Sequence, residues 1–264
     1  MAVDRWLGCY EPRRVARLRL FCFPFAGGSA SAYRGWSAGL PGDVEVCPIQ
    51  LPGREDRFTE LAFRRIRELV PVLADELCPL FDVPFAFYGH SMGSLIAFEL
   101  AHELVSRGSP GPVALFPAAH QAPRIPHKRA ISQLADADLI AHVEKISSTQ
   151  LLQHPELLKL ILPTLRCDFS LCDTYEFVSR AKLNCQITVF GGRDDVTREA
   201  LEAWGEETEG LFEIEVLAGG HFFLMSARSQ LQEILSQKLS RLLGLGRGSA
   251  AVGHASTKMW TEPA

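Results

Sequence analysis

One serine stands between two glycines where an apolar run gives way to a helical pattern. The stretch reads "FAFYGHSMGSLIAFELAHEL", Phe85 to Leu104, and its turn from Gly89 to Gly93 has the form G-x-S-x-G. A turn of this form between a strand and a helix is so tight that the serine adopts strained backbone angles, and glycines remove Cβ atoms that would collide with neighbouring chain. The hydroxyl then projects from the sheet edge toward a helix N-terminus, whose dipole favours negative charge. The pattern predicts Ser91 as a nucleophile rather than an ordinary helix-capping serine.

A serine hydroxyl is a weak nucleophile near neutral pH, so it needs a base and an acid that orients the base. The stretch "LAGGHFFL" places His221 in a glycine-rich loop after a late apolar run, whereas the other histidines lie in the turn, on helical patterns, in an insertion or in the tail. The stretch "GGRDD" places Asp194 and Asp195 after the preceding apolar run. Only one of these acids can face the imidazole. We prefer Asp195, because the extra residue gives the loop room to turn back over the sheet edge.

Acyl transfer to a serine also needs two backbone N–H donors for the tetrahedral oxyanion. One comes from the residue after the nucleophile, which here is Met92, and the other from a loop after an early strand. The stretch "FPFAGGSASAY" supplies such a loop, in which Gly27 and Gly28 let the backbone approach a ligand closely. We expect Ala26 to be the second donor. A phosphate-binding loop is disfavoured, because neither G-x-G-x-x-G nor G-x-x-x-x-G-K-[ST] is matched.

Short apolar runs alternate with helical patterns along the chain. The predicted strands, each bounded by Gly, Pro, Asp or Asn, are Leu18–Phe25, Val44–Gln50, Phe85–Tyr88, Val113–Pro117, Gln186–Phe190 and Phe212–Val216. The predicted helices, with apolar residues at three- and four-residue spacing, are Phe63–Leu77, Ser94–Arg107, Glu199–Trp204 and Gln230–Leu243. This alternation predicts an α/β fold with a mostly parallel central sheet flanked by helices. Between two of the strands, Gln121–Arg180 forms an insertion with a helical pattern of its own.

Composition limits the kind of protein further. A chain of 264 residues, 47% hydrophobic and 22% charged, has room for one large domain or two small ones. A net charge of −4 gives no electrostatic reason to expect nucleic acid or an anionic membrane as partner. The chain lacks a signal-peptide pattern and a membrane-spanning apolar run, so we expect a cytoplasmic protein.

The seven cysteines include no CxxC pair, which argues against a disulfide framework and against a zinc site. We expect them to be reduced and mostly buried. The Gly-, Ala-, Ser- and Thr-rich tail, residues 245–264, reads as disordered.

Six segments, in order and in spacing, resemble the signature motifs of the type II thioesterases. They are "FPFAGGSASAY", "LPGRED", "YGHSMGSLIAFELA", "LPTLRCDF", "GGRDD" and "GGHFFL". These thioesterases are free-standing α/β-hydrolases that accompany polyketide and non-ribosomal peptide synthases, and the resemblance extends from Leu18 to Leu243. It implies Ser91, Asp195 and His221 as the catalytic residues, with Ala26 and Met92 as the oxyanion hole. It also implies one domain over residues 1–244, with residues 121–180 as a helical lid over an acyl pocket. The alternative is that the helices of this insertion merely extend the core.

The reaction that the resemblance implies is hydrolysis of acyl groups held as thioesters on the phosphopantetheine arm of carrier proteins, which removes stalled or aberrant acyl units. It implies carrier protein domains as partners. A thioester has a good leaving group, so this chemistry needs no metal and no cofactor, and we expect a monomer. Two positions depart from the family pattern: Phe25 stands where many members have histidine, and Cys167 where alanine is usual. Both bear on substrate preference more than on catalysis. The alternatives are a general carboxylesterase or lipase, a medium-chain acyl-carrier hydrolase of fatty acid synthesis, a catalytically silent binding protein, or transfer of the acyl group to an internal hydroxyl.

Two groups of basic side chains have no role in thioester hydrolysis itself. Arg54 and Arg57, in and after "LPGRED", either pair with carboxylates or belong to a solvated turn, and we favour the solvated turn. Arg124, Lys128 and Arg129 begin the insertion, and we expect them to meet an acidic carrier protein.

Overall fold

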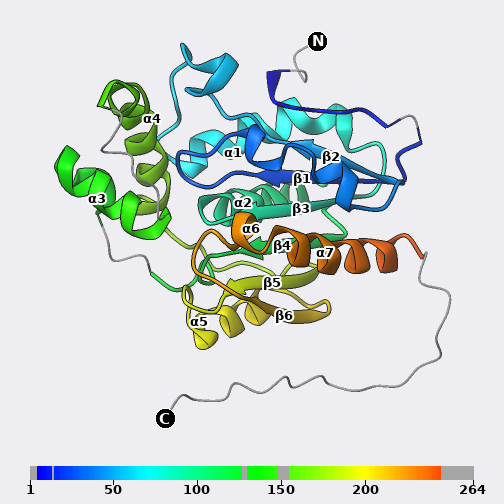
Figure 1. Ribbon diagram of the computed structural model, residues 1–264. Helices are drawn as coiled ribbons and strands as arrows, with labels where there is room; N and C mark the ends of the chain where they lie inside the picture. The colour runs from blue at the N-terminus through cyan, green and yellow to red at the C-terminus, as the bar shows by residue number, and fades with distance from the viewer. Residues whose placement is uncertain (1–4, 14, 127–129, 148–154, 245–264) are drawn as a thin grey trace.

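The computed structural model describes residues 5–13, 15–126, 130–147 and 155–244, and within them six strands form one parallel sheet (Figure 1). The order across the sheet is β2-β1-β3-β4-β5-β6. The strands are β1 (Leu18–Phe23), β2 (Val44–Pro48), β3 (Phe85–His90), β4 (Ala114–Ala118), β5 (Gln186–Gly192) and β6 (Phe212–Leu217). Each predicted strand is confirmed, and its ends differ from the prediction by at most two residues.

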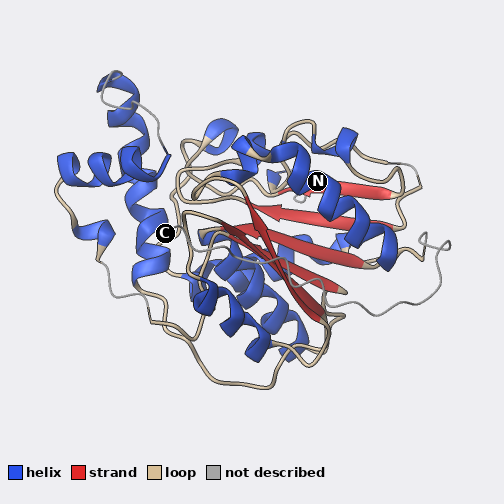
Figure 2. Ribbon diagram, turned by 60° about the horizontal axis from the view of Figure 1, so that its bottom comes forward, coloured by secondary structure: helices blue, strands red, loops and turns tan. Residues whose placement is uncertain are grey.

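Helices cover both faces of the sheet (Figure 2). One face packs against α1 (Ile66–Leu77), α2 (Met92–Ser106) and α5 (Arg198–Glu202), and the other against α6 (Phe223–Ser226) and α7 (Arg228–Leu242). The predicted α/β fold is therefore confirmed. The predicted helix Glu199–Trp204 is divided, because α5 passes into a 3₁₀ helix at Ala203–Glu207.

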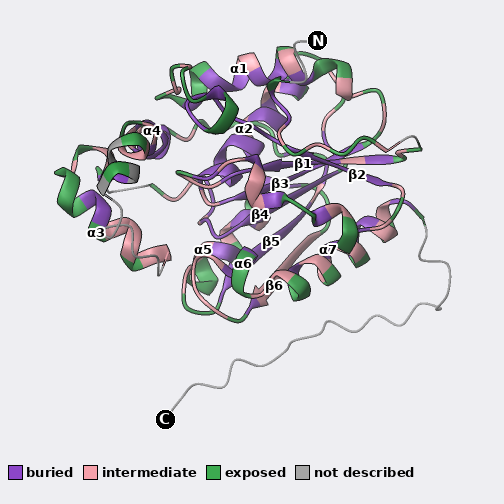
Figure 3. Cartoon of the chain, turned by 45° about the horizontal axis from the view of Figure 1, so that its top comes forward, coloured by how far each residue is buried: buried purple, intermediate pink, exposed green. Residues whose placement is uncertain are grey.

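The core consists of two apolar clusters separated by the sheet. Successive side chains of a strand point to opposite faces, so in β1 Phe21 and Phe23 join the cluster under α1 and α2, whereas Leu20 and Cys22 join the cluster under α7. Figure 3 shows the central strands largely in the colour of buried residues. Burial on both faces explains why these strands read as continuous apolar runs rather than as alternating ones.

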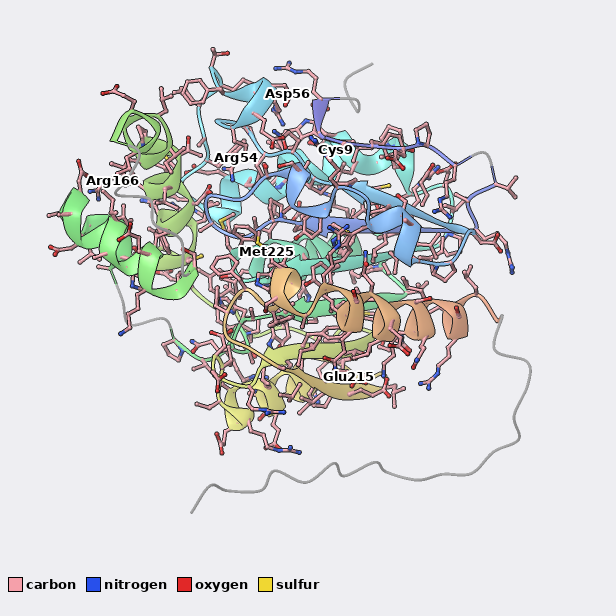
Figure 4. The ribbon with its side chains drawn as sticks, viewed as in Figure 1. Cys9, Arg54, Asp56, Arg166, Glu215 and Met225 are labelled. Carbon is pink, nitrogen blue, oxygen red and sulfur yellow. The ribbon has the colours of Figure 1, made fainter. Side chains whose placement is uncertain are left out.

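The insertion between β4 and β5 stands beside the sheet as two helices, α3 (Asp136–Ser147) and α4 (Pro155–Asp173) (Figure 1). Arg166 on α4 reaches the carboxylate of Asp136 and the backbone oxygen of Ser132, so the two helical segments are tied together (Figure 4). Their shared apolar cluster packs against the side chain of Ala26, in the loop after β1, and consists of Ile131, Leu139, Leu165 and Phe169. The insertion therefore rests on the loop that the sequence predicts to supply an oxyanion donor.

The strand order places a topological switch point between β1 and β3. From β1 the chain passes outward to β2, and from β3 it passes the other way to β4, so the direction of winding reverses between β1 and β3. In open parallel sheets, ligands bind at this switch point, outside the carboxyl ends of the strands. Phe23 pairs with Gly89 in the ladder, so β1 and β3 end nearly level and their following loops meet.

No helix in the described ranges is long and apolar enough to cross a membrane. The predicted disordered tail, residues 245–264, lies outside the described residues.

Candidate active site

Ser91 lies in the tight turn between β3 and α2, with φ 55° and ψ −118°. A Cβ on Gly89 would lie 2.2 Å from the backbone oxygen of Gly93, and a Cβ on Gly93 would lie 2.1 Å from that of Phe23. Both distances are far below van der Waals contact, so the turn admits only glycine on either side of the serine. The strained serine and the glycine requirement are what the G-x-S-x-G pattern predicts.

A second serine, which the sequence reading did not single out, supports this turn from inside. Ser94 is fully buried, and its hydroxyl donates to the backbone oxygen of Gly89 at 2.8 Å and accepts from the N–H of Ala118 at 3.1 Å. The N–H of Ser91 also donates to the oxygen of Ala118, at 2.7 Å. The end of β4 therefore holds the turn in place.

The structure brings Ser91, His221 and Asp195 together. The Nε2 atom of His221 lies 2.9 Å from Oγ of Ser91, and its Nδ1 atom lies 2.9 Å and 3.1 Å from the two carboxylate oxygens of Asp195. Asp194 is exposed, and its N–H donates to the oxygen of Gly219. In this geometry Nδ1–H donates to the carboxylate of Asp195, and Nε2 is free to accept the proton of the hydroxyl.

The two loops that carry the acid and the histidine lie against each other. A Cβ on Gly192, at the end of β5, would lie 2.5 Å from the backbone oxygen of Gly220, just before His221. The close approach of these backbones allows residues from two neighbouring strands to share a hydrogen bond. It therefore requires glycine at position 192, whereas Gly219 in the histidine loop has φ +101°, a conformation that favours glycine.

His90, the residue before the serine, holds the backbone of His221. It is fully buried, and its Nε2 atom lies 2.8 Å from the backbone oxygen of His221. Burial lowers the pKa of His90 well below its ordinary value, and the neighbouring His221 lowers it further. The ring is therefore neutral, and it donates Nε2–H to that carbonyl. The sequence reading gave His90 no role.

Aromatic rings lie beside His221. The ring of Phe222 lies 5.2 Å from that of His221, and Phe25 meets Phe222 edge to face at 4.9 Å. Phe25, one of the departures from the family pattern, thus forms part of an apolar wall beside the histidine.

The two expected oxyanion donors occupy suitable positions in the chain. Met92 is the first residue of α2, where a backbone N–H has no partner within the helix. Within the described ranges, the N–H of Ala26 forms no hydrogen bond, although the N–H of Gly27 donates to Asp168 at 2.7 Å and that of Gly28 to the oxygen of Phe25 at 2.8 Å.

The interpretation of Arg54 and Arg57 as a solvated turn is wrong. Both are buried, with 8% and 5% of their surface exposed. Arg54 forms two hydrogen bonds to the carboxylate of Asp168, at 2.7 Å and 2.9 Å, and Arg57 forms two to that of Glu60, at 2.7 Å and 2.9 Å. Burying a guanidinium is tolerated only when its donors are satisfied, and each arginine also donates to backbone oxygens.

The predicted basic patch is not supported at Arg124. Its guanidinium pairs with the carboxylates of Glu206 and Glu207, which ties the start of the insertion to the 3₁₀ helix after α5. Lys128 and Arg129 lie outside the described residues.

In the described part of the chain, no group of three His, Cys, Asp or Glu side chains could hold a metal ion. The seven cysteines are all unpaired; five are buried, whereas Cys9 and Cys78 are exposed.

The sheet order, the strained turn after β3 and the contacts among Ser91, His221 and Asp195 define an α/β-hydrolase fold with a serine, a histidine and an aspartate in hydrogen-bond contact. The model of the thioesterase domain family matches residues 18–240. The chain therefore belongs to the thioesterase domain family, and it is a hydrolase that acts on thioesters.

Three relatives illustrate the similarity. The gramicidin S biosynthesis protein GrsT of Aneurinibacillus migulanus is 40% identical over 91% of this chain and 96% of its own. The structure of the type II thioesterase BorB from the borrelidin biosynthetic cluster is 36% identical, with a TM-score of 0.83 over 89% of this chain and 98% of that one. The medium-chain S-acyl fatty acid synthase thioesterase of Homo sapiens is 33% identical over 84% of this chain and 86% of its own. The resemblance to the type II thioesterases is confirmed.

Proposed function

We propose that this protein removes acyl groups from the phosphopantetheine arms of carrier proteins, with Ser91, His221 and Asp195 as its catalytic residues. The observation that carries the proposal is the continuous chain of hydrogen bonds from the Ser91 hydroxyl through the imidazole to the Asp195 carboxylate, at the turn after β3. The same arrangement activates serine nucleophiles on several unrelated folds.

In the first half of the reaction, Oγ of Ser91 attacks the thioester carbonyl carbon while its proton passes to Nε2 of His221. The carboxylate of Asp195 holds the imidazole in the correct tautomer and stabilises the imidazolium. The negative charge that develops on the carbonyl oxygen is stabilised by the N–H groups of Ala26 and Met92. The carbon–sulfur bond then breaks, the thiol leaves with the proton from His221, and the acyl group remains on the serine.

In the second half, water takes the place of the thiol. His221 removes a proton from the water as it attacks the acyl-enzyme, and the same two N–H groups stabilise the second oxyanion. Collapse of this intermediate returns the proton to Oγ of Ser91 and releases the carboxylic acid.

The insertion is the proposed lid over the acyl chain. Its apolar cluster, which includes Leu139, Leu165 and Phe169, packs against Ala26 beside the proposed oxyanion hole. An acyl group bound to Ser91 would extend into an environment of this kind, and burial of each methylene there would stabilise the complex by about 0.8 kcal/mol.

The names of the relatives support a carrier-bound substrate, because GrsT is a gramicidin S biosynthesis protein and BorB comes from a borrelidin cluster. We place the protein in the reducing cytoplasm, which fits its seven unpaired cysteines. A monomer suffices for the reaction, since one chain supplies all three catalytic side chains.

The test is mass spectrometry of a panel of acyl-loaded carrier proteins before and after incubation with the enzyme. We expect loss of the acyl group from several carriers by the wild type and none by Ser91→Ala beyond a residual rate from binding and the oxyanion hole. Oxygen esters of the same acids, tested in parallel, should react more slowly. Equal rates on free oxygen esters and carrier thioesters would contradict the proposed substrate class.

A second candidate is a medium-chain hydrolase of fatty acid synthesis, which the similarity to the human fatty acid synthase thioesterase favours. The same panel separates the two. A hydrolase of fatty acid synthesis should act mainly on saturated chains of medium length, whereas an editing enzyme should also accept short and branched acyl groups.

A further inference from the structure

The loop that carries Ala26 is held in place by groups from two distant parts of the chain. Asp168, on α4, accepts the N–H of Gly27 at 2.7 Å, and Arg54, between β2 and α1, donates to the backbone oxygen of Gly28 at 2.8 Å. Gly27 has φ +77°, in the left-handed region that glycine adopts without strain. The two external contacts therefore fix a loop whose own sequence is conformationally permissive.

The orientation of the Ala26 N–H depends on this loop. The backbone oxygen of Phe25 accepts the N–H of Gly28 at 2.8 Å. In a planar trans peptide the C=O and the N–H point in opposite directions, so a bond that draws the Phe25 oxygen into the turn directs the N–H of Ala26 out of it. That bond forms only while Gly27 and Gly28 keep their present positions.

Arg54 and Asp168 form a buried ion pair. The guanidinium meets both carboxylate oxygens, at 2.7 Å and 2.9 Å, and Asp168 is only 1% exposed. A buried ion pair is weak evidence of a contribution to stability, because desolvation offsets its Coulomb attraction. Its hydrogen bonds, by contrast, are directional and so specify geometry. One hydrogen bond of Asp168 and one of Arg54 end on the loop of Ala26. Figure 4 shows Arg54 between α4 and the sheet.

Anchoring the insertion does not by itself require this pair. The hydroxyl of Thr164 already ties α4 to the same segment, through the backbone oxygen of Gly53 at 2.7 Å. Arg57 offers a comparison three residues further on: it is equally buried and pairs with Glu60, but its hydrogen bonds reach neither α4 nor the loop of Ala26.

We propose that Arg54 and Asp168 are positioning residues that orient the N–H of Ala26 toward the oxyanion, so that the seating of α4 and the assembly of the oxyanion hole depend on one ion pair. This inference rests on the proposed acyl transfer at Ser91. It gives the "LPGRED" and "LRCDF" segments one shared task, although they lie far apart in the sequence.

The experiment compares Asp168→Asn and Arg54→Lys with Arg57→Lys as the matched control. We measure kcat and KM with an acyl thioester of a small soluble thiol, the inhibition constant of a trifluoromethyl ketone analogue of the same acyl chain, and the melting temperature. The ketone forms a tetrahedral adduct with the serine and so reports on the oxyanion hole. Loss of a whole oxyanion donor costs about 10²–10³ in kcat, so a misdirected one should cost about 10- to 100-fold.

We expect both test variants to lower kcat and to weaken ketone binding by the same factor, with KM nearly unchanged, whereas Arg57→Lys lowers only the melting temperature. Test variants that melt earlier but keep their kcat and their ketone affinity would reduce the pair to a structural anchor and overturn the inference. A change confined to KM would also overturn it.

The rate at which a fluorophosphonate labels Ser91 separates this inference from the proposed function. When the fluorophosphonate reacts with Ser91, negative charge develops on its phosphoryl oxygen at the position of the oxyanion, and no thioester is involved. If the wild type is labelled but hydrolyses no thioester, the proposed function fails. In that event slower labelling of Asp168→Asn and Arg54→Lys than of Arg57→Lys still supports the positioning role, and equal labelling overturns it.

Discussion

Replacement of Gly93 by alanine tests how tightly the turn of Ser91 is packed. The new Cβ would lie 2.1 Å from the backbone oxygen of Phe23 and 2.9 Å from that of Pro24. Ordinary contact begins at 3.4 Å, so the shortfall against the nearer oxygen is about 1.3 Å. Both obstacles are backbone atoms at the end of β1, which no side-chain rotation can move aside. Either the turn of Ser91 or the loop of Ala26 must shift.

A shift of this size has a predictable cost. Misplacement of catalytic groups by about 1 Å lowers turnover by about 10²-fold, and overpacking costs about 1–3 kcal/mol of stability. We therefore expect Gly93→Ala to lower kcat about 100-fold on an acyl thioester of a small thiol, with a smaller effect on KM. The assay follows release of the free thiol, and urea unfolding reports the stability of the same preparation.

Gly108→Ala, just beyond the other end of α2, is the control. Its φ is +70°, but a Cβ there would meet nothing within 4 Å. The substitution should cost about 1–2 kcal/mol of stability through backbone strain alone and leave kcat unchanged. A folded Gly93→Ala enzyme that kept its kcat within about threefold of the wild type would refute the steric reasoning for the turn.

Two further predictions concern protons. Asp195→Asn should lower kcat about 10⁴-fold, because the amide favours the wrong imidazole tautomer. Asp194→Asn should lower kcat far less, since that side chain is exposed. If a steady-state assay showed the larger loss for Asp194→Asn, the acid would have to be reassigned to Asp194. Burial, with a smaller contribution from Arg180, lowers the pKa of His102 from 6.5 to about 4. As the pH falls from about 6.5 to about 4, the unfolded chain therefore takes up this proton while the folded chain does not, and the free energy of unfolding should fall on account of His102. Urea unfolding at a series of pH values should show a shallower fall for His102→Gln, and an unchanged slope would contradict the buried, neutral imidazole.

The parts of the structure that follow local rules could be predicted from the sequence. The run "QITVF" indicates a buried strand, and the glycines around Ser91 indicate a tight turn. Each signal lies within a few residues, so the sheet and the turn of Ser91 follow from short-range patterns. The placement of His221 after the last strand follows from the same patterns, because parallel strands bring their carboxyl ends to one edge.

The ion pair of Arg54 with Asp168 could not be predicted in this way. The two residues are separated by 114 positions, and Arg54 stands in a polar segment that is also typical of a solvated turn. Their pairing follows from how α4 packs on the loop after β1, and neither segment by itself carries this tertiary information. The contact of His90 cannot be predicted for a similar reason. Its partner is a backbone oxygen, which every residue carries, so the residue types do not indicate it.

The contact between Asp168 and Arg54 sets a rule for exchanging acyl pockets between enzymes of this fold. If α3 and α4 form the proposed lid, exchanging these helices together with their apolar cluster would change which acyl chains are accepted. A transplant without an acid at position 168 would leave the guanidinium of Arg54 buried and unpaired, at a cost of about 3–5 kcal/mol. Transplants should therefore be chosen by that single acid first and by the shape of their pocket second, because a chimaera that lacks the acid loses both stability and the contact that holds the loop of Ala26.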